Sequence, residues 1–80
     1  MDSVGYVKVI PVGLLKRYAG DKESPLLVDG GNRTVDELLE ELGIPSPLVA
    51  IVLVNGRQKL KTHILQEGDV VKSVPLVGGG

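Results

Sequence analysis

Three consecutive glycines, Gly78 to Gly80, end the sequence and leave the backbone carboxylate of Gly80 available for reaction. A terminus that reacts inside a partner must be thin, extended and free of side chains beside the reacting carbonyl, and glycine meets all three demands. Gly79 and Gly80 carry this prediction, and Gly78 serves as a permissive spacer. Counted from Pro75, the six last residues reach about 20 Å when fully extended. The tail therefore suits a protein that presents its own C-terminus to an enzyme.

The side chains offer no competing catalytic site. The 80 residues include one histidine and no cysteine, which excludes disulfides, thiolate metal sites and a cysteine nucleophile. His63 has no companion at metal-ligand spacing, and no two carboxylates have the spacing of an acid and a base. Gly30-Gly31 lacks the pattern of a phosphate-binding loop and is predicted to be a turn. We expect a chain that binds no metal or cofactor itself and is not a catalyst alone.

Composition argues against nucleic acid and membranes as partners. The net charge is -1, and the chain has two tyrosines, no phenylalanine and no tryptophan on which bases could stack. The longest apolar run, Leu48 to Val54, is far shorter than the about 20 residues that cross a bilayer. Asp2 stands where a signal peptide would carry positive charge. We expect a cytoplasmic protein, which also suits the absence of cysteine.

The first half of the chain predicts two short strands and two helices. Gly5 to Ile10 is a β-branched run that predicts a strand, and Leu14 to Tyr18 has the apolar spacing of a short helix. Leu26 to Val28 predicts a second strand. Thr34 to Glu37 has the pattern of a capping box and marks the start of the main helix. Gly43 is predicted to end that helix in the left-handed conformation.

The second half predicts three strands. Ile51 to Val54 is apolar without alternation, which is typical of a central strand covered on both faces. Asn55-Gly56 predicts a type I′ hairpin, from which Arg57 to Lys61 should return as a polar edge strand. Glu67 to Asp69 predicts a turn before the last strand, Val70 to Val74.

The order of these elements predicts an α+β fold of the β-grasp, ubiquitin-like type. It consists of a mixed sheet of about five strands packed on one main helix, with an additional short helix. Residues 1–75 should form this domain, and residues 76–80 should form a flexible glycine tail.

Partner binding is predicted on the sheet face opposite the main helix. Val70, Lys72 and Val74 alternate with Val71 and Ser73, so the first three side chains could form apolar docking surface. An equally good interpretation is that Val70, Lys72 and Val74 simply complete the core. The tail segment, Pro75, Leu76, Val77 and Gly78, is the other predicted contact with partners. The basic segment Arg57 to Lys61 either steers the chain toward an acidic partner or, as we favour, protects a solvated edge from aggregation.

The chain resembles the MoaD/ThiS family of ubiquitin-like sulfur carriers. Four segments carry the resemblance: Thr34 to Gly43, Val54 to Gly56, Glu67 to Val71 and Pro75 to Gly80. The extra segment Leu14 to Tyr18 looks more like MoaD, the small subunit of molybdopterin synthase, than the shorter ThiS. Val74 and Leu76 depart from MoaD, which commonly has aromatic residues in the last strand and a second proline.

The resemblance implies a sulfur carrier whose Gly80 carboxylate is activated by an E1-like adenylating enzyme that uses ATP and Mg. Sulfur from a cysteine desulfurase or rhodanese would then give a thiocarboxylate, which a larger synthase subunit would use, most consistently to make molybdopterin. Three alternatives stay open: a ThiS-type carrier for thiamine thiazole synthesis, a protein modifier conjugated through Gly80, and a plain interaction module. A frayed glycine-rich end is the alternative for the tail itself.

Overall fold

A mixed sheet and one α-helix make up most of the computed structural model, which describes residues 5–19 and 26–76. In chain order the elements are β1 (Tyr6–Pro11), the 3₁₀ helix η1 (Gly13–Ala19), β2 (Leu26–Asp29), α1 (Val35–Leu42), the 3₁₀ helix η2 (Ser46–Leu48), β3 (Val49–Val54), β4 (Arg57–Lys59) and β5 (Val70–Pro75).

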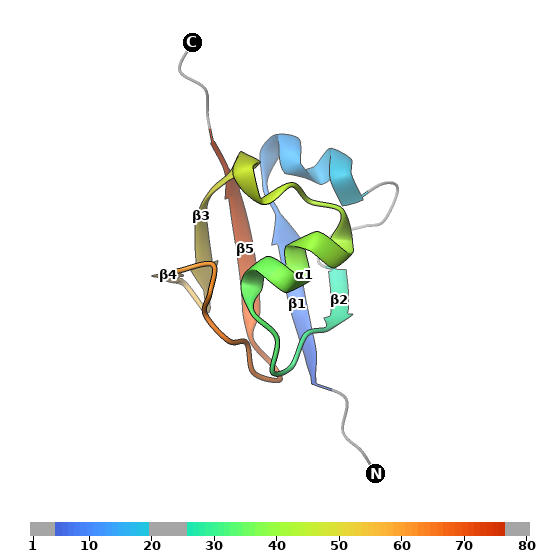
Figure 1. The fold of residues 1–80 in the computed structure, drawn as a ribbon, viewed down its shortest axis with the longest axis vertical. Coiled ribbons are helices and arrows are strands. Elements are labelled where there is room, and N and C mark those ends of the chain that lie inside the picture. Colours follow the sequence, from blue (N-terminus) through green and yellow to red (C-terminus); the bar gives the residue numbers. More distant parts are fainter. Residues whose placement is uncertain (1–4, 20–25, 77–80) are drawn as a thin grey trace.

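The strands form one sheet in the order β2-β1-β5-β3-β4. The central pair, β1 and β5, is parallel, and the other neighbours are antiparallel. Figure 1 shows α1 crossing one face of this sheet. The predicted β-grasp arrangement, a mixed sheet packed on one main helix, is therefore confirmed.

The main helix begins and ends as its sequence predicts. The Thr34 hydroxyl accepts a hydrogen bond from the Glu37 backbone N–H at 3.2 Å, and the Glu37 carboxylate accepts one from the Thr34 backbone N–H at 2.9 Å. Gly43 ends the helix with φ at 78°, which glycine adopts without a steric penalty. The helix packs its apolar stripe on the sheet, and the core that results contains Val7, Val9, Leu15, Leu26, Val35, Leu38, Leu39, Ile44, Val49, Val52, Val54, Leu65 and Val71.

The hairpin after β3 also follows its sequence. Asn55 and Gly56 have φ values of 55° and 85°, as a type I′ turn requires. The Asn55 amide joins this turn to the start of β5, because its Nδ2 donates to Asp69 Oδ1 at 2.9 Å and its Oδ1 accepts from the Val70 N–H at 3.0 Å. The two turns at this end of the sheet therefore support each other.

The expectation that β3 is covered on both faces is wrong. Val52 and Val54 are buried beneath α1, but Ile51 on the opposite face is 38% exposed and Leu53 is half-buried. The physical reason is that α1 covers one face of the sheet, and no described element covers the other. β3 also begins at Val49, two residues earlier than predicted.

Three further details differ from the sequence-based expectations. The segment from Leu14 to Tyr18 is helical but of the tighter 3₁₀ type, which is common in short helical pieces. β4 ends at Lys59 rather than Lys61. The 3₁₀ helix η2, which begins after Pro45, has no counterpart among the elements that the sequence predicts.

Candidate functional site

The root of the C-terminal tail is fixed to the body of the protein. Pro75 is the last residue of β5 and is buried, and it pairs with Val49 of β3. The backbone N–H of the next residue, Leu76, donates to the Leu48 carbonyl at 2.8 Å. On the other side of the root, a Cβ added to Gly13 would lie 3.4 Å from Pro75 Cγ. The tail therefore leaves the body at Leu76, between η1 and η2.

The remaining predicted tail residues, Val77, Gly78, Gly79 and Gly80, lie outside the described residues. Their predicted roles in activation and partner binding stay predictions. The bond from Leu76 to Leu48 nevertheless limits their reach. Four residues, fully extended, carry Gly80 no farther than about 14 Å from Leu76, which is less than the reach counted from Pro75.

Val70, Lys72 and Val74 lie together on the sheet face that α1 leaves uncovered. Lys72 is exposed and the two valines are half-buried, whereas the alternating residues Val71 and Ser73 are buried toward α1. Completion of the core is thus the role of Val71 and Ser73. A part for the other three residues in partner binding stays a prediction, but they have the placement that it requires.

The register of the sheet surrounds these three residues with more apolar side chains. Ile51 lies beside Val74, Leu53 and Ile10 lie on either side of Lys72, and Leu27 lies beside Lys8. We call this surface the open face, and its residues are Tyr6, Lys8, Ile10, Leu27, Asp29, Ile51, Leu53, Gln58, Val70, Lys72 and Val74.

Most residues of the open face were not predicted from the sequence, although the pattern of one strand was sufficient to predict some of them. The alternation of β1 places Tyr6, Lys8 and Ile10 on one face and buries Val7 and Val9 on the other. That signal alone identifies an uncovered face. The face on which Ile51 lies could not be predicted from alternation, because the strand pairing is irregular at Ala50. Val49 pairs with Pro75 and Ile51 pairs with Val74, and Ala50 between them has no partner in the register.

The helix α1 and the open face differ in charge. The helix α1 carries four carboxylates, from Asp36, Glu37, Glu40 and Glu41, and no cation. The strands β1, β3, β4 and β5 carry no carboxylate. The open face carries Lys8 of β1 and Lys72 of β5, together with one carboxylate, Asp29 of β2, which pairs with Tyr6. A partner with an acidic, partly apolar surface is the best electrostatic match for the open face.

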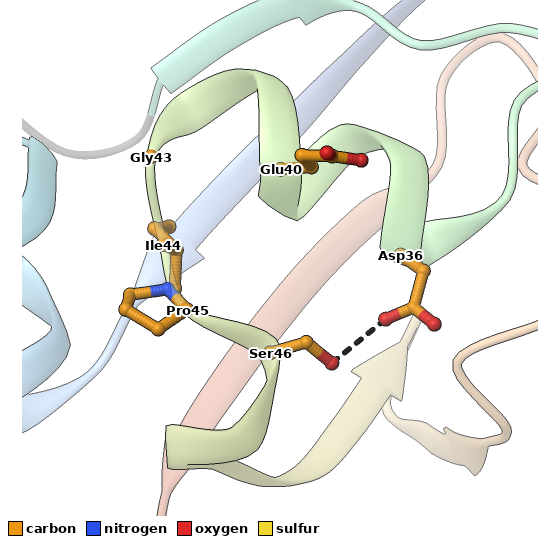
Figure 2. Close-up of a pocket in the computed structure, with 6 residues that line it drawn as sticks. All are labelled: Asp36, Glu40, Gly43, Ile44, Pro45 and Ser46. Atoms are coloured by element: carbon orange, nitrogen blue, oxygen red, sulfur yellow. Dashed lines mark hydrogen bonds between the residues drawn. The ribbon is translucent and has the colours of Figure 1, made fainter.

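A hollow of about 420 Å³ lies on the other side of the protein, between α1 and η2. Figure 2 shows the Ser46 hydroxyl pointing at Asp36, to whose Oδ1 it donates at 2.8 Å. The Lys61 ammonium group donates to the Ser46 carbonyl at 2.8 Å. The first bond connects η2, and with it the root of the tail, to the main helix, and the second connects η2 to the segment after β4.

The part of the chain that the structure describes brings no metal-binding group together. Within residues 5–19 and 26–76, no cluster of three or more histidine, aspartate or glutamate side chains could hold a metal ion. His63 is half-buried and has no such companions. Among the same residues, no helix has both the length and the apolar character needed to cross a membrane.

Comparison with known proteins agrees with this geometry. Residues 12–80 match the model of the ThiS family. The solution structure of the Haloferax volcanii HVO 2177 protein is similar in fold, with a TM-score of 0.69 and 25% sequence identity, and the match covers 100% of this chain and 92% of that chain. A search of curated proteins found no match. The chain thus belongs to the ThiS family of ubiquitin-like sulfur carriers.

Proposed function

We propose that the chain carries sulfur as a thiocarboxylate on Gly80. In the first step the Gly80 carboxylate attacks the α-phosphorus of ATP, which the adenylating enzyme holds with Mg, and pyrophosphate leaves. A sulfur nucleophile then attacks the activated carbonyl carbon and displaces AMP. The carrier itself binds no cofactor in this scheme, and its own contribution is to position the terminus.

The observation that carries the proposal is the match of residues 12–80 to the ThiS family, which includes the glycine tail. The fixed root supports it. Because Leu76 is bound to Leu48, every conformation of the tail starts from one defined point on the body. A fixed starting point reduces the conformational entropy that the tail loses when it enters an active site.

Docking on the open face completes the proposed role. ThiS-type carriers generally work with adenylating enzymes and synthase partners. The open face combines apolar area with Lys8 and Lys72, and it extends along β5 to the root of the tail. A partner that covers Val70, Lys72 and Val74 can therefore continue along Pro75 and Leu76 into the tail. Val77 and Gly78 would then lie inside the channel of the partner that leads to its active site.

The direct test is intact mass spectrometry after incubation with the adenylating enzyme, Mg-ATP and sulfide. The expected product has one sulfur in place of one oxygen at Gly80. A variant that lacks Gly80 should gain no sulfur, yet it should melt at the same temperature, because the core ends at Pro75. A full-length chain that never gains sulfur would contradict the proposal.

The proposal also concerns the biosynthetic pathway that receives the sulfur. The helical segment η1 supports a MoaD-like role in molybdopterin synthesis, and the ThiS family match supports thiazole formation. Loaded carrier should be mixed with a pterin precursor and a large molybdopterin-synthase subunit, or with a thiazole synthase and its substrates. Sulfur transfer in the first mixture alone supports the molybdopterin role, and transfer in the second alone contradicts it. The proposed sulfur donor in the cell is a cysteine desulfurase or rhodanese, whose persulfide is reduced by a thiol to sulfide with formation of a disulfide.

A further inference from the structure

The helix η1 lies directly beside the root of the tail. The N–H of Val12, just before η1, donates to the Ser73 carbonyl of β5 at 3.0 Å. Gly13, its first residue, has φ at 61° and lies beside Pro75, because an added Cβ would be in ordinary contact with the proline ring at 3.4 Å. Figure 1 shows η1 and η2 at the end of the sheet where β5 finishes.

The short reach of the tail requires a partner to come close to η1. An enzyme that reacts at Gly80 must place its reacting atoms within about 14 Å of Leu76. Seven residues of 3₁₀ helix have a similar length, about 14 Å at about 2 Å per residue. The mouth of a channel that receives the tail must therefore lie against the surroundings of Leu76, of which η1 is one side.

The exposed surface of η1 is apolar and basic. Its buried residue, Leu15, anchors the helix in the core, while Leu14 and Tyr18 are 46% and 41% exposed. Lys16 and Arg17 are exposed as well. The helix contains no carboxylate. Across the root of the tail, η2 is uncharged and Leu76 is 58% exposed.

We propose that η1 is a second docking surface, separate from the open face, which binds the rim of the tail channel in the adenylating enzyme. Charge complementarity requires carboxylates on that rim, opposite Lys16 and Arg17. Apolar side chains of the rim pack on Leu14, Tyr18 and Leu76. The proposal rests on the proposed function, because it assumes that Gly80 is activated inside a partner.

The test is a charge reversal with a matched control. Lys16→Glu/Arg17→Glu should raise the KM of the adenylating enzyme for the carrier at least about tenfold in ATP–pyrophosphate exchange, with little change in kcat, because rim charges act mainly on association. Higher salt should reduce the difference from the unmodified chain. Arg57→Glu/Lys59→Glu changes the net charge equally on β4, away from the tail, and should change KM less than about twofold.

Two additional variants separate docking from folding. Lys16→Gln/Arg17→Gln removes the charges without adding repulsion and should raise KM by a smaller factor. Leu14→Ala should also raise KM and, because Leu14 is 46% exposed and lies outside the core, should change the melting temperature little. Thermal melts of all variants should match that of the unmodified chain.

The possible outcomes are distinct. Equal KM values for the η1 variants and the unmodified chain would overturn this inference alone, and so would equal increases from the η1 and β4 variants. An unmodified chain that supports no pyrophosphate exchange would instead overturn the proposed function, and this inference with it.

Discussion

At the scale of single residues, Ser73 stands out because a polar group lies inside an apolar core. Its side chain is completely buried, and within the described residues its hydroxyl has no hydrogen-bond partner. It faces α1 from β5, between Pro11 of β1 and Val52 of β3. A buried hydroxyl without a partner costs about 1–3 kcal/mol. Ser73 therefore lowers the stability of the strand that leads into the tail.

Replacement of Ser73 by alanine should stabilise the protein. Ser73→Ala removes the unpartnered hydroxyl and keeps the small volume, so the free energy of unfolding should rise by about 1 kcal/mol. Urea denaturation at equilibrium measures this change. Ser46→Ala is the matched control, and it should lower the free energy of unfolding, because the Ser46 hydroxyl donates to Asp36. A loss of stability in Ser73→Ala would show that the hydroxyl has a partner in solution.

At the scale of elements, the start of α1 determines how firmly the main helix is held. Thr34 and Glu37 satisfy each other's backbone N–H groups, and the N–H groups of Val35 and Asp36 donate to the carbonyls of His63 and Lys61. The capping box thus acts together with bonds from a segment far along the chain. The first turn of the helix is fixed from both directions.

Loss of the capping side chain should destabilise the whole domain. Thr34→Ala should lower the free energy of unfolding by about 1 kcal/mol, because the Glu37 N–H loses its acceptor. Thr34→Ser keeps the acceptor and should recover most of this loss, and Thr62→Ala, at an exposed turn residue, should change little. Urea denaturation of the three variants gives the comparison. Equal stability of Thr34→Ala and the unmodified chain would contradict a stabilising cap.

The elements also show which features a sequence can predict. The capping box at Thr34 and the turn at Asn55-Gly56 were predicted correctly, because their signals lie within a few residues of the feature. The exposure of Ile51 was not, because it depends on how many layers cover the sheet. The bond from Leu76 to Leu48 joins distant segments and leaves no local signal. The geometry of the tail root was therefore not predictable from the sequence, and the glycine tail itself stays a prediction.

At the scale of the whole molecule, the sheet separates two surfaces of different chemistry. The helix α1 is acidic, while the open face is largely apolar and carries Lys8 and Lys72 with one carboxylate, Asp29. The tail root lies at one end of β5, where the open face and η1 both approach it. A partner that binds the open face and this end of the sheet therefore also contacts the tail.

A charge placed on the open face should weaken the binding of a partner without unfolding the protein. Ile51→Asp adds a carboxylate beside Val74, at a side chain that is already 38% exposed. The dissociation constant for the adenylating enzyme should rise at least about tenfold, which corresponds to about 1.4 kcal/mol. Isothermal titration calorimetry measures this constant, and a thermal melt shows whether the fold is kept. We expect the melting temperature to change little, because the core residues of β3 face the other way.

Ile64→Asp is the control for that variant. Ile64 is 52% exposed and pairs with Thr34 at the start of α1, so the same change in charge and polarity falls off the open face. Its dissociation constant should stay close to that of the unmodified chain. If Ile51→Asp binds as tightly as the unmodified chain, partners do not cover the open face. If both variants weaken binding equally, added negative charge acts on the molecule as a whole, and only η1 and the tail would remain as specific contacts.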